Sequence, residues 1–198
     1  MHTLEFFFDF GSPYSYLAYR RLPHITQAHG TEILWRPLLL GRVFQATGNS
    51  SPATVPLKAR YALTDLERWA AHYQTPFRHN PNFPINTLQL MRGATGMQMY
   101  YKEQFLHYLS TVFSAMFENP QNMGDMAIVR EVLNAAGISF DLFNELINTP
   151  AVKEQLKQDT EAAIARGVFG VPTFFVEDEM FWGQDRLLFV EAALAAPA

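Results

Sequence analysis

Hydrophobic and polar positions near the start of the chain follow two different periods. Leu4–Phe10 is a short aromatic run, too short and too rich in phenylalanine for a helix, so we expect a buried strand. Ser12-Pro13 is typical of a helix start, and Gly30 is typical of a helix end. Within that helix Pro23 removes a backbone donor, so we expect a kink or a break just before it. Thr31–Pro37 alternates as a second strand, which completes a predicted β-α-β unit.

The middle of the chain, from about residue 38 to residue 167, has an almost wholly helical pattern. Apolar residues recur at helical spacing along 62–73 and again, over a longer stretch, along 101–116. The connection between these stretches, 75–86, is rich in proline and asparagine, so it cannot be one continuous helix.

Strands return towards the end of the chain. Thr173–Val176 and Met180–Trp182 are apolar and flank a polar turn, which predicts a hairpin, and Gln184-Asp185 opens a helix that runs through Leu194. Strands at both ends with helices between them predict an α/β domain that is interrupted by an all-helical insertion. We place the α/β domain at 1–40 and 168–198, and the helical insertion domain at 41–167.

Composition and charge limit the partners of such a protein. The chain has 198 residues, of which 48% are apolar and 17% charged, so it is long and apolar enough to fold around a core. Its 15 lysines and arginines stand against 19 aspartates and glutamates, a formal net charge of −4, and they form no basic run. Binding to a nucleic-acid backbone needs a basic surface, so we expect a small organic ligand and no nucleic acid.

Two residue types and two sequence signals restrict the chemistry further. Cysteine is absent, which excludes disulfides, thiolate metal sites and a thiol nucleophile on the protein itself. The six histidines have no recognisable ligand spacing, so we expect no metal. The start of the chain lacks the basic region of a secretory signal, and no uncharged apolar stretch approaches the roughly 18 residues of a membrane span. We therefore expect a cytoplasmic protein without a membrane partner.

A hydroxyl stands where the first strand gives way to the first helix. Ser12 lies at this junction, and a helix N-terminus offers unpaired N–H donors and a partial positive charge, which suit an anion such as a thiolate or an oxyanion. Serine is also a common N-cap. Taken alone, the segment leaves both interpretations of Ser12 open.

Two further segments combine backbone groups with polar side chains. Gly170-Val171-Pro172-Thr173 places an X-Pro bond directly before an apolar strand. Such a bond is often cis and turns the preceding backbone outward, although an ordinary trans proline at a strand edge fits as well. Trp182-Gly183-Gln184-Asp185 precedes the last helix, where helix donors and side chains suit a carboxylate or an amino group; Asp185 as a simple N-cap is the alternative.

Together these segments resemble a known family. Phe7–Ala18, Phe169–Phe174 and Trp182–Leu187 look like motifs of the 2-hydroxychromene-2-carboxylate isomerases and the related kappa-class glutathione transferases. The resemblance also includes Gly48-Asn49 and Pro56-Leu57-Lys58, and it extends over nearly the whole chain. It implies a thioredoxin-like domain with an inserted all-helical domain, assembled as a homodimer.

The resemblance also implies glutathione as the cofactor. Ser12-Pro13-Tyr14-Ser15 stands where a DsbA-type oxidoreductase has Cys-x-x-Cys, so the thiol has to come from outside the chain. Ser12 is then the catalytic residue, which donates its hydroxyl proton to the glutathione sulfur, while the helix start favours the thiolate. The other residues that the resemblance assigns to glutathione are the backbone of Val171 and the segment Trp182, Gly183, Gln184 and Asp185. Asn49 and Lys58 match positions that contact glutathione or the second substrate.

The implied reaction is a cis-trans isomerisation in aromatic degradation. A thiolate adds reversibly to the conjugated carbon of a small aromatic 2-oxo acid, and 2-hydroxychromene-2-carboxylate and o-hydroxybenzylidenepyruvate interconvert. Phe83 and Tyr61 are candidates for an apolar wall around the substrate ring. Two alternatives stay open: a kappa-like glutathione S-transferase or peroxidase that acts on another small electrophile, and a non-catalytic thioredoxin-fold binding protein in which Ser12 is only a cap.

Overall fold

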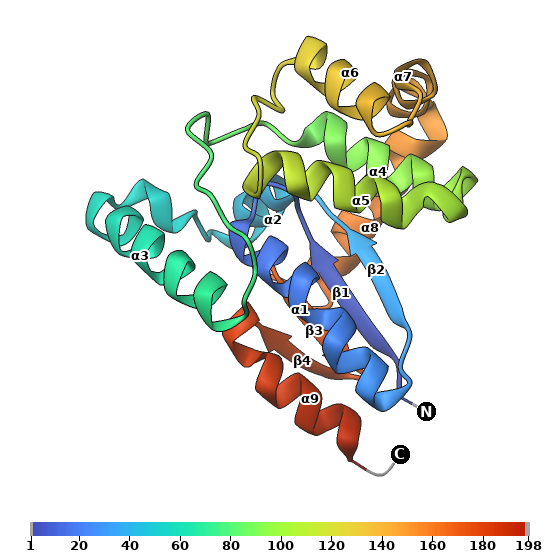
Figure 1. Ribbon diagram of the computed structural model, residues 1–198. Helices are drawn as coiled ribbons and strands as arrows, with labels where there is room; N and C mark the ends of the chain where they lie inside the picture. The colour runs from blue at the N-terminus through green and yellow to red at the C-terminus, as the bar shows by residue number, and fades with distance from the viewer. Residues whose placement is uncertain (1, 197–198) are drawn as a thin grey trace.

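A four-stranded mixed sheet with the order β2-β1-β3-β4 lies at the centre of the computed structural model, which describes residues 2–196 (Figure 1). Its strands are β1 (Leu4–Phe8), β2 (Ile33–Pro37), β3 (Thr173–Val176) and β4 (Glu179–Trp182). β1 pairs with β2 in parallel and with β3 in antiparallel fashion, and β3 and β4 form the predicted hairpin. Segments that are far apart in the sequence therefore close one sheet, as we expected.

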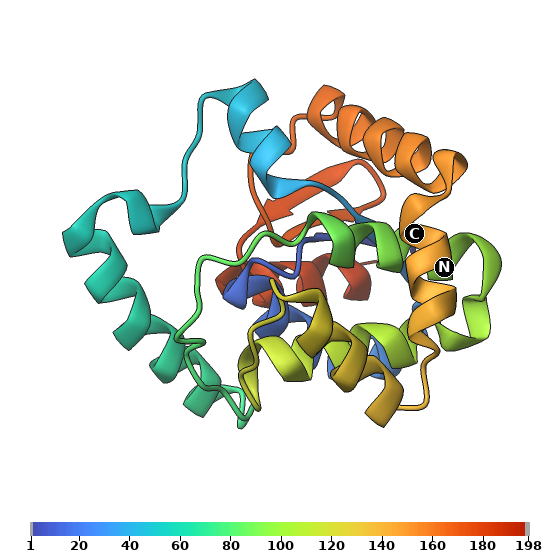
Figure 2. The same ribbon diagram turned by 90° about the horizontal axis from the view of Figure 1, so that it is seen from above.

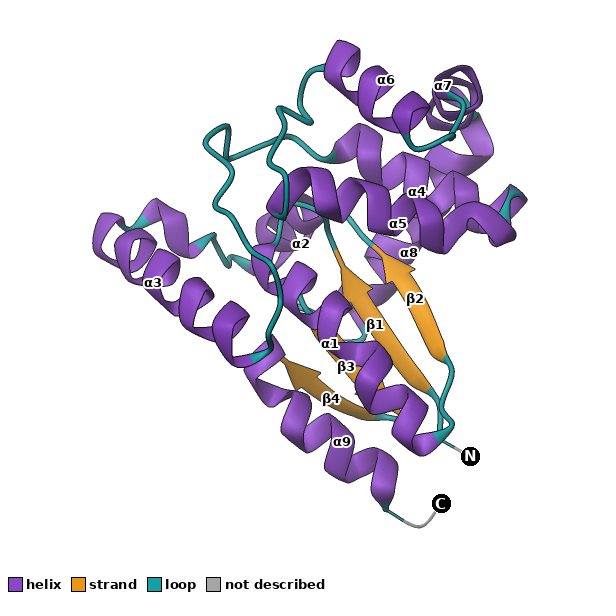
Figure 3. Ribbon diagram, in the orientation of Figure 1, coloured by secondary structure: helices purple, strands orange, loops and turns teal. Residues whose placement is uncertain are grey.

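The helices cover this sheet, and most of them belong to the sequence between β2 and β3. They are α1 (Pro13–His29), α2 (Leu40–Thr47), α3 (Pro56–His72), α4 (Leu88–Tyr100), α5 (Lys102–Phe117), α6 (Met126–Ala135), α7 (Phe140–Asn148), α8 (Pro150–Ala165) and α9 (Leu187–Ala195), with short 3-10 turns η1 (Pro52–Thr54) and η2 (Gln184–Arg186). Strands occupy one region of the molecule, and helices form the rest (Figure 3). The exact division of the chain into two domains stays a prediction.

Successive side chains of β1 point to opposite faces of the sheet, and both faces are buried. Phe6 and Phe8 pack with the large core on the side of α1 and α9, whereas Phe7 and Phe175 pack with a smaller core that includes side chains from α2 and α8. Seen from above, α1 and α9 lie on one side of the sheet, and α2 and α8 lie on the other (Figure 2). Because both faces are covered, β1 reads as a nearly continuous apolar run rather than an alternating one.

The break expected in α1 near Pro23 is absent, whereas the expected kink stays a prediction. The helix continues through Pro23 without a break and ends at Gly30, which has a left-handed backbone with φ +62°. Proline removes one N–H donor but accepts the helical φ value, and the helix buries Leu22 and Ile25 on either side of it. Packing of that apolar face outweighs the single lost hydrogen bond.

α3 stands away from the other helices in both views (Figures 1 and 2). Its second half buries Leu66 and Ala70, while Leu57 and Tyr61 in its first half are exposed. The C-terminal half of α3 therefore packs against the rest of the protein.

Two kinds of feature are absent from residues 2–196. No helix there is both long and apolar enough to cross a membrane. No three histidine, aspartate or glutamate side chains gather there in a way that would hold a metal ion.

Candidate active site

Ser12 connects the first turn of α1 to a loop from the other end of the chain. Its Oγ accepts the backbone N–H of Ser15 at 3.1 Å, so Ser12 is the N-cap of α1. The same hydroxyl donates to the backbone carbonyl of Val171 at 3.3 Å. Only 5% of Ser12 is exposed. The cap and the contact across the fold therefore coexist, and the two interpretations of Ser12 do not exclude each other geometrically.

The loop before β3 supplies the other half of this contact. The Val171–Pro172 peptide bond is cis, one of the two forms that the sequence left open. The carbonyl of Pro172 accepts the N–H of Gly183 at 2.9 Å, which holds the loop against the end of β4. Among the described residues, the backbone N–H of Val171 has no hydrogen-bond partner. That donor remains available to a ligand.

A sharp turn after β4 places Asp185. Gly183 has φ +101°, and a Cβ at this position would lie 2.5 Å from Asp185 Oδ1, so only glycine leaves the carboxylate in place. Gln184 is buried, and its carbonyl accepts the hydroxyl of Tyr73 at 2.9 Å. Tyr73 therefore anchors the C-terminal end of α3 to η2, a contact that the sequence did not predict.

These segments border one cavity of about 1310 Å³. The structure brings to it every residue that the sequence assigned to glutathione or to the second substrate: Ser12, Asn49, Lys58, Val171, Trp182, Gly183, Gln184 and Asp185. Their common position is a structural fact, whereas their roles stay predictions.

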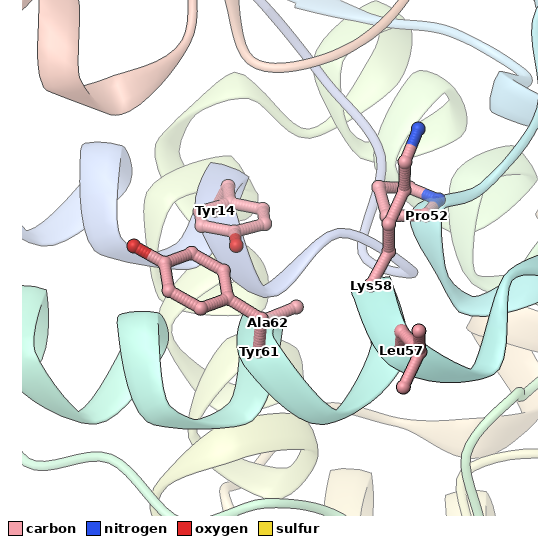
Figure 4. A pocket seen from close by; sticks show the side chains of 6 residues that line it. All are labelled: Tyr14, Pro52, Leu57, Lys58, Tyr61 and Ala62. Carbon is pink, nitrogen blue, oxygen red and sulfur yellow. The ribbon is translucent and has the colours of Figure 1, made fainter.

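The two residues predicted for the second substrate are not equally available. Asn49 uses both polar atoms of its side chain: Nδ2 donates to the carbonyl of Phe169 at 2.8 Å, and Oδ1 accepts the N–H of Ser50 at 2.8 Å. Lys58 is exposed, and it borders both the large cavity and a hollow of about 380 Å³ beside it (Figure 4). In this structure, then, Asn49 braces the loop before Val171, and Lys58 is free to meet a ligand.

The two candidate aromatic walls lie in different places. Phe83 lines the large cavity, together with Leu63 and Trp69. Tyr61 lines the smaller hollow instead, where its ring lies near that of Tyr14 (Figure 4). Phe83 thus lines the same cavity as Ser12, and Tyr61 does not.

Tyr14 makes a second contact that the sequence did not predict. Its hydroxyl donates to Asp65 Oδ2 at 3.3 Å, which joins the first turn of α1 to α3. Burial, reinforced by the charge of Asp65, raises the pKa of Tyr14, and burial raises the pKa of Tyr73 to about 12. At neutral pH both tyrosines are therefore protonated hydrogen-bond donors.

Asp9 joins three segments behind Ser12. Its Oδ1 accepts the N–H of Gly11 at 2.8 Å and the hydroxyl of Thr87 at 2.6 Å, and its Oδ2 accepts the N–H of Leu40 at 2.9 Å. Burial raises the pKa of the Asp9 carboxyl, and these three hydrogen bonds oppose that effect. The signal was present in the sequence, because a lone acid inside the aromatic run Phe7–Phe10 needs a buried partner.

Comparison with known proteins places this site in a family. The model of the DsbA-like thioredoxin domain matches residues 3–195, so the chain belongs to the DsbA-like thioredoxin family. The thioredoxin-like fold that we expected is thereby confirmed. The chain has no cysteine, so its own side chains cannot exchange disulfides.

Within this family the chain is similar to one group in particular. It is 36% identical over 196 residues to a 2-hydroxychromene-2-carboxylate isomerase of Pseudomonas putida, covering 96% of this chain and 93% of the relative. A solved structure of a 2-hydroxychromene-2-carboxylate isomerase superposes with a TM-score of 0.85 at 34% identity, covering 97% of this chain and 94% of the other. Glutathione S-transferase kappa 1 of Homo sapiens is 27% identical over 197 residues, covering 93% and 87%. The resemblance to this group is confirmed.

Proposed function

We propose that this protein is a glutathione-dependent isomerase that interconverts 2-hydroxychromene-2-carboxylate and o-hydroxybenzylidenepyruvate in aromatic degradation. The observation that carries the proposal is the position of Ser12, whose hydroxyl lies at the N-terminus of α1, in the cavity and 3.3 Å from the Val171 carbonyl. The names of the similar isomerases support the reaction, and the kappa-class relative supports the use of glutathione.

The residues that line the cavity fit glutathione, a tripeptide with a thiol, two carboxylates and an ammonium group. The unpartnered N–H of Val171 and its carbonyl offer one donor and one acceptor to the cysteinyl backbone. The Asp185 carboxylate, for which Gly183 leaves room, suits the γ-glutamyl ammonium. Trp182 and Gln184 complete this side of the cavity.

Bound glutathione would supply a thiolate for reversible addition to the conjugated carbon, which would allow rotation about the former double bond. The task of Ser12 is to stabilise the charge on the sulfur. Its hydroxyl turns from the Val171 carbonyl towards the anion, while its oxygen keeps the N–H of Ser15 and α1 stays capped. The N-terminal end of α1 adds a partial positive charge in the same place.

The other half of the cavity suits the aromatic 2-oxo acid. Phe83, Leu63 and Trp69 present apolar surface to a ring, and Lys58 offers an ammonium to the substrate carboxylate. Asn49 braces the loop that carries Val171, and we assign it to contact with glutathione or with the second substrate.

The proposal is tested with variants of two serines that both cap a helix, of which only Ser12 lines the cavity. Ser139 caps α7 as Ser12 caps α1, with Oγ accepting the N–H of Leu142 at 3.3 Å, and it does not line the cavity. Ser12→Ala and Ser139→Ala each remove a cap and each lower the free energy of unfolding by about 1 kcal/mol. A hydrogen bond to a charged group contributes about 1.5–3 kcal/mol, so we expect Ser12→Ala alone to reduce glutathione-dependent turnover roughly 10- to 100-fold.

The assay follows the interconversion optically, with and without glutathione. Turnover that needs glutathione, persists in Ser139→Ala and falls in folded Ser12→Ala supports the proposal. Equal activity of the two variants would show that Ser12 has no role in the reaction. Turnover that does not depend on glutathione would show that glutathione is not the cofactor.

A kappa-like glutathione transferase is the second candidate, favoured by the relative from Homo sapiens. The two functions differ in their products, because conjugation consumes glutathione and isomerisation leaves its concentration constant. The expected homodimer and the cytoplasmic location also stay predictions, to be checked by light scattering and by cell fractionation.

A further inference from the structure

Asp9 is a buried acid beside the proposed site that the mechanism above does not use. It is 3% exposed and lines the same cavity as Ser12. Its two oxygens accept hydrogen bonds from Gly11, Leu40 and Thr87. These residues lead into three different elements, α1, α2 and α4, whose N-terminal ends meet at this point. The position therefore combines a structural tie with an ionisable group.

The hydrogen bonds favour the ionised form of Asp9. The N–H groups of Gly11 and Leu40 can only donate, and each points at a different carboxylate oxygen, at 2.8 Å and 2.9 Å. The Thr87 hydroxyl is able to donate as well, at 2.6 Å. The carboxylate satisfies all three donors at once, whereas an acid proton would have to share an oxygen with one of them.

Covalent geometry keeps this charge close to Ser12. Asp9 Oδ1 lies 2.8 Å from the nitrogen of Gly11, and Ser12 is the next residue. The Ser12 hydroxyl is therefore within about 10 Å of the carboxylate. Two unit charges that are about 10 Å apart at an effective dielectric constant of about 20 shift each other's pKa by about one unit.

We propose that the Asp9 carboxylate counteracts the positive end of α1, so that a thiol held at Ser12 is a stronger base than the helix alone would allow. The usefulness of this effect rests on the proposed function. An isomerase has to add a thiolate and expel it again, and nucleophilicity falls as the thiol becomes more acidic, whereas the ease of leaving rises. A thiol that titrates near the working pH serves both steps, and Asp9 moves it in that direction.

The absence of cysteine allows a test that needs no glutathione. Ser12→Cys places the only thiol of the chain at the site, and its pKa is read from the ultraviolet absorbance of the thiolate or from its rate of alkylation. Adding Asp9→Asn removes the negative charge, and we expect the pKa of the introduced thiol to fall by about one unit, a tenfold change in acidity. Asp9→Ser is a second neutral variant, which keeps one oxygen as an acceptor for Gly11.

Thr87→Val in the same Ser12→Cys background is the matched control. It removes one of the three hydrogen bonds but keeps the carboxylate and its two backbone donors, so we expect less than half of the shift that Asp9→Asn causes. The other ionisable groups that border the cavity are the same in all these variants, so the differences report on Asp9. These groups are Tyr14, Lys58, Arg60, Asp65, His79, Asp185 and Arg186.

Circular dichroism establishes that each variant is folded. An unchanged or raised pKa of the thiol in a folded neutral variant would overturn the proposal, and so would an equal fall in Thr87→Val, because that would identify a purely structural role. If neither neutral variant folds, Asp9 serves the fold and the proposal is wrong as well. Failure of the protein to bind glutathione would refute the proposed function but would leave this titration interpretable.

Discussion

Gly183→Ala tests whether the turn after β4 matters for the position of the Asp185 carboxylate as well as for the stability of the fold. The backbone of Gly183 has φ +101°, and an added Cβ would lie 2.5 Å from Asp185 Oδ1. The variant therefore carries backbone strain and also forces the Asp185 carboxylate to move. Gly167 provides the comparison, because it has φ +90° and an added Cβ would meet no atom within 4 Å.

Backbone strain lowers the stability of the variant, whereas displacement of Asp185 lowers its affinity for glutathione. Alanine at position 167, where φ is +90°, should lower the free energy of unfolding by about 1–2 kcal/mol. Gly183 combines φ +101° with ψ 143°, a region used almost only by glycine, so Gly183→Ala should cost more, up to about 3 kcal/mol. Displacing Asp185 removes a charge-assisted hydrogen bond to the γ-glutamyl ammonium, which contributes about 1.5–3 kcal/mol. We therefore expect glutathione to bind roughly 10- to 100-fold more weakly to Gly183→Ala alone.

Titration calorimetry measures the affinity for glutathione, and chemical unfolding measures the stability of the same samples. Weak binding by Gly183→Ala beside normal binding by Gly167→Ala would support the role of Asp185. Equal affinities of the two folded variants would show that the position of the Asp185 carboxylate does not matter for the ligand, and the reasoning would be refuted.

Two further predictions concern the fold. Gly93→Ala should lower the free energy of unfolding by about 1–3 kcal/mol in a denaturant titration, because its Cβ would overlap the buried hydroxyl of Tyr108. Burial acts to raise the pKa of Glu5, but hydrogen bonds from Arg166 and Arg36 outweigh it and the pKa is lowered. Because the pKa of Glu5 is lower in the folded than in the unfolded protein, its ion pairs stabilise the fold at a pH above the unfolded pKa, and this stabilisation is lost as the pH falls. Arg166→Gln should therefore lower the free energy of unfolding by up to about 1 kcal/mol near pH 7 and by less near pH 3. An equal loss at both pH values would contradict this.

Local sequence signals predicted much of the secondary structure. The aromatic run before residue 10, the Ser12-Pro13 helix start and the hairpin of β3 and β4 each depend on a few neighbouring residues, and the structure confirms all three. The predicted break at Pro23 failed because the burial of an apolar helix face is a tertiary effect that a single proline does not reveal.

The contacts around the cavity were only partly accessible from the sequence. Patterns brought Ser12 and Val171 forward as candidates, but their hydrogen bond joins positions 159 residues apart. The bond from Tyr14 to Asp65 and the use of both polar atoms of Asn49 leave no periodic or local trace. Such pairings depend on how the helical segment folds back, which single-residue propensities do not encode.

The central position of β1 also sets an order of events for a chain that emerges from the ribosome. Leu4 pairs with Ile33 of β2, a partner that is synthesised soon after it, but on its other edge it pairs with Val176 of β3. Until residue 176 has emerged, β1 keeps one edge of backbone donors and acceptors exposed, although the intervening helices can already pack against it, as Phe113 of α5 does against Phe8. The loop that carries Val171 reaches Ser12 in the same late step, so the sheet and the cavity are completed together, after most of the chain has been made.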